Sequence, residues 1–336
     1  MKRSLRTAIA FALASLGLCA NAGAKIVTFQ IPNAQAIWPT AMNDQGAVTG
    51  YYSDRAYRYR GFLFAPDGVL TTFDVPVPVW DRRSAGAVEY TFPTGISGSG
   101  AITGSYSRGS SISNGFVRAA NGLFTTFSVG SQTAPLGANR KGWIVGRYWR
   151  DDENAFQPFL RDPSGAAVEF SVPGATGGIL ATVVNRSRTI AGNFFVRAGF
   201  QGFFLPAHGT ATTFGDPHQQ AVVTGINDAG TITGWFQDQN TAAFVRTSDG
   251  TLTTFLGPDG ATGAQAWGIN NSGTIVGAFA DSQRIGHGFI RAADGTFTPF
   301  DIEGGSLAEI RAINDKGAIA GYAWKDGVRI GFAGKP

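Results

Sequence analysis

The segment GINDAGTITG, residues 225–234, decides the fold because it recurs along the whole chain. In each of its seven copies a glycine follows seven residues after an Asn-like position. These glycines are Gly50, Gly104, Gly146, Gly192, Gly234, Gly277 and Gly321, so the copies follow one another about every 45 residues. A recurrence of this length predicts a fold built from one repeated supersecondary unit.

A second recurring segment carries two aromatic residues eleven positions apart, as in GFLFAPDGVLTTF at 61–73. If Asp67-Gly68 forms a two-residue hairpin turn, Phe62 lies directly opposite Phe73, and each hairpin carries a cross-strand aromatic pair. The complete copies are Phe62/Phe73, Phe116/Phe127, Phe159/Phe170, Phe203/Phe214, Phe244/Phe255 and Phe289/Phe300.

Each repeat is interpreted as four strands, illustrated by residues 266–270, 273–281, 287–293 and 295–302. The N-D-x-G segment between the first two strands suits a tight turn, because Asn bonds locally and Gly adopts a left-handed conformation. We therefore interpret these asparagines as turn formers: Asn43, Asn139, Asn185, Asn227, Asn270 and Asn314. Four-stranded units at this period are typical of a β-propeller, and a linear β-solenoid is the alternative.

The two ends of the repeat array distinguish these architectures. The seventh repeat stops at GFAGKP, with Phe332 but no fourth strand, whereas KIVTFQIP at 25–32 is a fourth strand without a repeat of its own. A closed ring explains this division and an open solenoid does not. We predict an all-β protein with a single seven-bladed propeller domain at 25–336, in which Phe29 pairs with Phe332.

Residues 1–24 have the features of a secretory signal peptide. Lys2, Arg3 and Arg6 precede an apolar run and A-x-A cleavage sites. The mature chain is therefore expected to be secreted or periplasmic. Cys19, the only cysteine, lies in this leader, so no disulfide is expected in the mature chain. No other stretch approaches the roughly 20 apolar residues of a membrane span.

The charge balance gives no reason to expect nucleic acid as a partner. The chain has 27 basic and 23 acidic residues, and removing the three basic residues of the leader leaves 24 basic residues. A nearly neutral mature chain lacks the electrostatic attraction that dominates nucleic-acid binding. We expect a monomer.

The repeats resemble those of the bacterial extracellular HAF-repeat family. The resemblance depends on GINDAGTITG, AINDKGAIAG at 312–321, GYYSD at 50–54 and HGFIRAADGTFTPFDI at 287–302, and it spans nearly the whole mature chain. The H-G-F triplet itself occurs only at His287. Ser97 replaces the turn asparagine in repeat two, and Arg188 replaces the turn glycine in repeat four. The resemblance implies an exported, propeller-like protein and no established activity.

The variable loops are expected on one face of the propeller, together with the mouth of its central channel. Two of them, residues 75–93 and 147–157, interleave aromatic residues with Arg and carboxylates, which suit sugar rings or a carboxylated ligand. A solvated insertion with internal ion pairs is the alternative. The predicted ligand-binding residues are Trp80, Asp81, Arg82, Arg83, Tyr90, Arg147, Trp149 and Arg150.

The sequence favours a binding module for a glycan, cell-surface component or extracellular polymer, and it leaves an enzyme open. A hydrolase or lyase acting on a polysaccharide or lactone would use weak catalytic candidates at the channel mouth: His218, His287, Asp81 and Asp151. No cofactor is expected. A calcium site would use Asp151, Asp152 and Glu153, although the D-x-D-x-D-G pattern is missing. A purely structural extracellular role is the third hypothesis.

Overall fold

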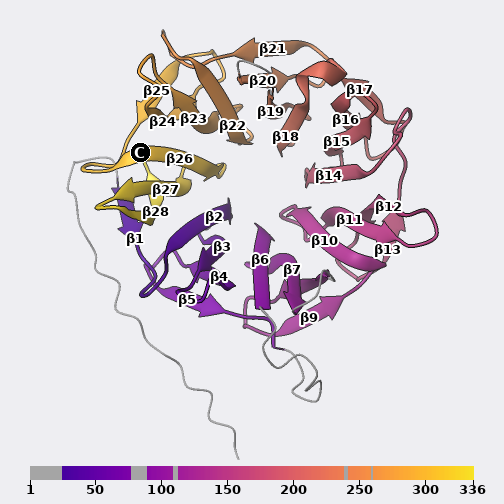
Figure 1. Ribbon diagram of the computed structural model, residues 1–336, viewed down its shortest axis with the longest axis horizontal. Helices are drawn as coiled ribbons and strands as arrows, with labels where there is room; N and C mark the ends of the chain where they lie inside the picture. The colour runs from indigo at the N-terminus through magenta and orange to yellow at the C-terminus, as the bar shows by residue number, and fades with distance from the viewer. Residues whose placement is uncertain (1–24, 77–88, 109–112, 238–240, 259) are drawn as a thin grey trace, which may run out of the picture.

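A computed structural model describes residues 25–76, 89–108, 113–237, 241–258 and 260–336. Seven antiparallel sheets of four strands each are arranged around a central channel (Figure 1). The fold is therefore an all-β seven-bladed propeller, as the repeats predict. Within these ranges no helix is long and apolar enough to cross a membrane.

In blades 1 to 6 the first strand lies next to the channel, and the second, third and fourth strands follow outward in sequence order. Blades 1 to 3 consist of β2 (Ala36–Met42), β3 (Val48–Ser53), β4 (Tyr59–Phe64), β5 (Leu70–Phe73); β6 (Glu89–Ile96), β7 (Ile102–Arg108), β8 (Ser113–Arg118), β9 (Phe124–Phe127); and β10 (Ser131–Ala138), β11 (Ile144–Arg150), β12 (Ala155–Arg161), β13 (Ala167–Glu169).

Blades 4 to 6 follow the same order, and a short 3-10 helix, η2 (Pro217–Gln219), lies between blades 4 and 5. Their strands are β14 (Ile179–Val184), β15 (Ile190–Val196), β16 (Gly199–Leu205), β17 (Thr212–Phe214); β18 (Ala221–Ile226), β19 (Ile232–Phe236), β20 (Ala242–Arg246), β21 (Leu252–Phe255); and β22 (Gly263–Ile269), β23 (Ile275–Ala280), β24 (Gly286–Arg291), β25 (Phe297–Phe300).

Blade 7 joins the two ends of the described chain. It consists of β26 (Ser306–Ile313), β27 (Ile319–Lys325), β28 (Val328–Lys335) and the N-terminal β1 (Lys25–Phe29). The first strand pairs antiparallel with β28 and becomes the outer strand of the blade. The predicted closure of the ring is confirmed. The predicted pairing of Phe29 with Phe332 is wrong, because Phe29 lies opposite Gly331.

In blade 1 the hairpin between the third and fourth strands has a three-residue loop, and β1, which no hairpin joins to β28, pairs with the same one-residue shift. The N–H of Ala65 donates to the Val69 carbonyl at 2.8 Å, and Gly68 has a left-handed φ of 86°. One extra loop residue shifts the register by one position, so Phe73 lies opposite Gly61 instead of Phe62. The predicted cross-strand aromatic pair is therefore wrong. The Phe73 ring covers Gly61, where a Cβ atom would overlap the ring.

The same phenylalanines pair between neighbouring blades. The aromatic residue of each outer strand contacts the fully buried third-strand aromatic residue of the next blade, with ring centroids 5.1 to 6.4 Å apart. The seven pairs are Phe29/Phe62, Phe73/Phe116, Phe127/Phe159, Phe170/Phe203, Phe214/Phe244, Phe255/Phe289 and Phe300/Phe332. The Phe29/Phe62 pair matches the other six. Strand β1 therefore gives blade 7 the same aromatic contact with its neighbour that every other blade has.

The turn asparagines also connect the blades. Asn314 accepts hydrogen bonds from the N–H groups of Lys316 and Ala318 at 3.0 and 2.9 Å, as expected of a turn former. Its Nδ2 atom donates to the Asn43 carbonyl of the next blade at 3.0 Å. Equivalent bonds leave Asn43, Asn139, Asn185, Asn227 and Asn270. At Ser97 the connection to blade 3 is a backbone bond from Gly98 to the Arg140 carbonyl.

Candidate ligand site in the central channel

The connections between strands divide the molecule into two faces. The tight turns after each first and third strand, such as 43–47 and 65–69, lie on one side, which we call the turn face. Because the strands are antiparallel, the remaining connections and all blade crossings lie on the other side, the loop face. The variable segments therefore share one face, as predicted.

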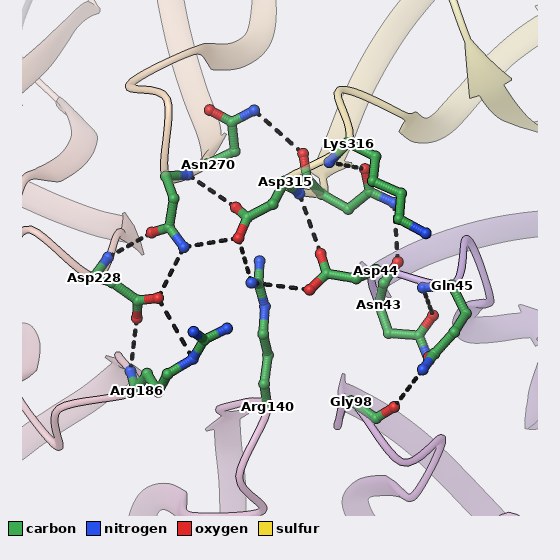
Figure 2. A network of polar contacts seen from close by, with 12 residues as sticks. Asn43, Asp44, Gln45, Gly98, Arg140, Arg186, Asp228, Asn270, Asp315 and Lys316 are labelled. Atoms are coloured by element: carbon green, nitrogen blue, oxygen red, sulfur yellow. Dashed lines mark hydrogen bonds and ion pairs between the residues drawn. The ribbon is translucent and has the colours of Figure 1, made fainter.

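A network of polar side chains lies around the channel at the turn face (Figure 2). Arg140 extends from blade 3 and pairs with Asp44 of blade 1 at 2.9 Å and with Asp315 of blade 7. Asn271 donates from Nδ2 to Asp315 at 2.7 Å and to Asp228 at 2.8 Å. We call these five residues and Arg186, which lies beside Asp228, the polar ring.

The charged residues of the polar ring pair with one another, two arginines with three aspartates. Hydrogen bonding from Arg140 lowers the pKa of Asp315 despite partial burial, and Asn271 lowers it further. The same pair raises the pKa of Arg140. The carboxylates and guanidinium groups of the polar ring therefore already have partners within the protein.

Next to the polar ring, the channel forms a cavity of about 510 Å³. Each innermost strand has a register shift that projects one residue into it, and these residues are Thr40, Thr94, Leu136, Thr182, Thr224, Trp267 and Arg311. The four threonines donate to a carbonyl of the next blade at 2.8 to 3.2 Å, so they connect the blades.

Trp267 and Arg311 depart from this pattern in two consecutive blades. The Arg311 guanidinium lies over the Trp267 indole, 3.4 Å from its centroid, and Trp235 contacts the same indole edge-on at 4.3 Å. Arg311 bonds to Glu309 at 3.3 Å, whereas the buried Nε1 of Trp267 has no hydrogen-bond partner among the residues that the structure describes. The cavity wall is therefore aromatic and basic on one side.

A second series of aromatic and arginine side chains lies in blades 7, 1 and 2. Arg329 stacks over Trp38 at 4.9 Å, Trp38 stacks on Tyr51 at 5.1 Å, and Tyr51 contacts Phe92 edge-on at 5.1 Å. Burial raises the pKa of Tyr51, and the charge of Arg311 opposes this effect. We call the two series together the channel belt: Trp235, Trp267, Arg311, Arg329, Trp38, Tyr51 and Phe92.

A groove of about 670 Å³ adjoins the channel belt on the loop face, between blades 7 and 1. Segment 30–35, which connects β1 to β2, forms one side, and Arg55 and Arg329 are also part of its lining. Arg329 therefore belongs both to the channel belt and to this groove.

The predicted ligand-binding residues lie in separate places. Tyr90 stacks on Phe92 at 5.8 Å and so extends the channel belt, whereas Arg147 and Trp149 pack on Phe156 within blade 3. Arg150 pairs with Glu153 at 2.6 Å and also with Glu169. Among the described residues, no contact joins the blade 3 group to Tyr90. Trp80, Asp81, Arg82 and Arg83 lie outside the described ranges.

The acidic residues considered for calcium have partners within blade 3. Asp151 accepts a bond from Ser131 at 2.9 Å, Asp152 lies 4.0 Å from Arg150, and Glu153 pairs with Arg150. In the described part of the chain, no group of three or more His, Cys, Asp or Glu residues could hold a metal ion.

His287 lies between two carboxylates, with Nδ1 2.9 Å from Asp301 and Nε2 3.5 Å from Asp281. Burial alone would lower the pKa of His287, but the two carboxylates outweigh it and raise the pKa. Blade 1 has the same arrangement at equivalent positions, with Arg60 between Asp54 and Asp74. We call each cation with its two carboxylates a carboxylate staple.

The other catalytic candidates are not joined to His287 by any described contact. The backbone N–H of His218 donates to Asp216 at 2.9 Å, and its side chain is exposed at the start of blade 5. Asp151 lies in the blade 3 hairpin, and Asp81 is outside the described residues. Their catalytic roles remain predictions.

No family model and no curated protein matches the chain. Virginiamycin B lyase from Staphylococcus aureus has a similar structure, with a TM-score of 0.60 at 16% identity, covering 93% of this chain and 100% of that chain. The propeller domain of the Trilobed protease from Pyrococcus furiosus, described with an open velcro topology, gives 0.64 at 12% identity over 90% and 95%. A streptogramin B lyase gives 0.58 at 14% over 93% and 98%. At these identities the likenesses show the propeller fold alone.

Proposed function

We propose that the chain is an exported binding protein that takes a glycan at the loop-face end of its central channel. The observation that carries this proposal is the channel belt, a set of aromatic and arginine side chains in five blades, of which Trp235, Trp267 and Arg311 line the cavity. Four of the seven repeats place threonine at the channel position, so Trp267 and Arg311 are local departures from the repeat.

The chemistry of the channel belt fits sugar recognition. Aromatic faces bind the apolar face of a sugar ring, while guanidinium and indole N–H groups donate to its hydroxyl oxygens. The polar ring at the opposite end has its own ion pairs, so we place the ligand at the loop face. The HAF-repeat resemblance and the leader-like residues 1–24 support the view that such a ligand is extracellular.

A glycan array with residues 25–336, followed by calorimetry on the best ligands, tests this function. We expect Trp267→Phe to weaken binding about tenfold, which corresponds to about 1.4 kcal/mol, because the larger ring and its N–H are lost. Trp143→Phe, a change on the turn face, is the matched control and keeps the affinity. The runs are made with and without calcium, which also tests the calcium alternative.

The proposal is abandoned if no glycan binds, or if both tryptophan variants bind as well as the parent protein. Export is tested separately by expressing the full chain and measuring the mass of the periplasmic or secreted product. Cleavage after Ala24 would begin the mature protein at Lys25. A full-length product retained in the cytoplasm would contradict export.

A further inference from the structure

We infer that the ligand of the channel site is an acidic glycan bearing carboxylates, and that Arg311 binds one of them. This inference rests on the proposed function and specifies its ligand class. Three features of the channel belt and the adjoining groove carry it: the positive charge of the arginines, the single hydrogen bond from Arg311 to Glu309, and the covered indole of Trp267.

The first feature is an excess of positive charge over carboxylates. Arg311, Arg329 and Arg55 gather along the cavity and the groove. Within the described residues Glu309 is the one carboxylate that pairs with any of them, at 3.3 Å from Arg311. The partly buried Arg329 is stacked on aromatic rings, and its Nε atom has no partner.

Other arginines that stack on aromatic rings, such as Arg118 and Arg161, also have an Nε atom without a partner among the described residues, whereas two arginines elsewhere pair with carboxylates. Arg140 pairs with two carboxylates in the polar ring, and Arg60 pairs with two in its carboxylate staple. Partly buried cations favour an anion nearby, because desolvation penalises an uncompensated charge. An acidic ligand would supply at this site what protein carboxylates supply elsewhere.

The second feature is that Arg311 can exchange its hydrogen bond to Glu309 for bonds to a ligand carboxylate at a low cost in free energy. One nitrogen, Nη1, bonds to Glu309, whereas a guanidinium can hold a carboxylate through two parallel bonds. Glu309 can be solvated after the exchange, since 29% of its side chain is exposed. Turning Arg311 to the ligand therefore leaves no buried carboxylate without a partner.

The third feature is the covered indole of Trp267. The Arg311 guanidinium occupies the indole face, and the indole Nε1 is buried without an acceptor. When Arg311 turns to the ligand carboxylate, the same movement uncovers a ring face and a free donor. A uronic acid residue combines the required groups: a carboxylate for Arg311, a ring for the indole face and a hydroxyl for Nε1.

The test is calorimetry with uronate oligosaccharides and their carboxyl-reduced forms, which share the sugar ring but lack the charge. Probes with galacturonate, mannuronate, guluronate and glucuronate units are used, together with sulfated neutral oligosaccharides. We expect at least one uronate to bind tenfold or more tightly than its reduced form and to lose affinity as salt is raised. Arg311→Gln should remove most of this preference and change binding of the reduced form less than twofold.

Arg186→Gln, on the turn face, is the matched control and should keep the preference. Arg311→Lys is the second variant if Arg311→Gln does not fold, and it should retain only part of the preference because it loses the two-bond geometry. Indole fluorescence should change on uronate binding in the parent protein and change less in Trp267→Phe.

The outcomes separate the two proposals. Equal binding of uronates and reduced forms, or binding of sulfated probes alone, would overturn the acidic-glycan inference while the glycan-binding function stands. An unaltered preference in folded Arg311→Gln would overturn the role of Arg311. Failure of every charged and neutral glycan to bind would overturn both proposals.

Discussion

At the scale of single residues, the two carboxylate staples show how one repeat position serves different cations. Arg60 in blade 1 and His287 in blade 6 both bridge an acidic residue after the second strand and another after the fourth. Asp281 also accepts two backbone bonds in its own loop, from Gln283 and Ile285, both at 2.8 Å. His287 thus has a structural explanation that requires no catalytic role.

The histidine staple should make stability depend on pH. Because the folded pKa of His287 is raised, its stabilisation is full below the usual histidine pKa of about 6.5 and is lost as pH rises through the folded value. Thermal unfolding should show a larger difference between the parent protein and His287→Gln at pH 5.5 than at pH 8.5. The effect should stay within about 1 kcal/mol, because such partly exposed pairs are weak.

Arg60→Gln is the matched control for this prediction. Its cost should be the same at both pH values, since arginine stays charged throughout. A pH-independent cost of His287→Gln would contradict the assignment of His287 as the titrating cation.

The residue scale is also where the sequence predicted the site least well. Trp267 stands in an ordinary apolar strand and Arg311 in an alternating one, so neither pattern indicates a channel position. Aligning the first strands would have helped, because Thr40, Thr94, Thr182 and Thr224 occupy the equivalent place. The β-bulge that points this residue toward the channel depends on packing between blades. No pattern in the local sequence therefore predicts it.

At the scale of elements, the number of blades and the closure by β1 could be predicted, because the repeat count and the divided repeat are visible in the sequence. The hairpin register could not. An Asp-Gly pair is compatible with a two-residue or a three-residue loop, and the structure has the longer one, with Gly68 in the left-handed region. The aromatic residues therefore pair between blades.

The closing strand β1 gives a prediction at this scale. Phe29 is 2% exposed, and its ring stacks on Phe64 at 4.2 Å and contacts Phe62 at 5.8 Å. Phe29→Ala should lower the free energy of unfolding by about 3–5 kcal/mol, as other buried phenylalanine truncations do. Denaturant unfolding followed by fluorescence measures the change.

Phe29→Leu, which keeps most of the buried volume, should cost clearly less. Deleting residues 25–32 should be more severe than either substitution, since it exposes the unpaired edge of β28 and promotes aggregation. A deletion variant with unchanged solubility and melting temperature would refute closure by β1.

At the scale of the whole molecule, Arg140 connects blades that are distant in sequence and on different sides of the channel. Its contact with Asp315 bridges 175 residues. Arg140→Gln should lower the free energy of unfolding by about 2 kcal/mol at pH 7, a typical value for a hydrogen-bonded charge. Lys141→Gln, an exposed neighbour, is the control and should have little effect.

Acid should reduce this difference. The pKa of Asp315 is lowered in the folded state, so its stabilisation is present above the usual aspartate pKa of about 3.9 and is lost as pH falls through the folded value. The melting temperatures of the parent protein and Arg140→Gln should approach each other below pH 4. A constant difference from pH 7 to pH 3 would show that the charge pair is not responsible.

Blade 7 contains strands from both ends of the described chain, so the propeller can be completed only after β28 has been synthesised. Strand β1 is made before blade 1, and its partner β28 is made about 300 residues later. Until then Phe62 and Phe64 lack the finished neighbour that covers the other blades, and apolar surface stays open to water. Long-range pairing of this kind slows folding and prolongs exposure to aggregation. A chain that crosses a membrane unfolded before it folds would have both ends available at once.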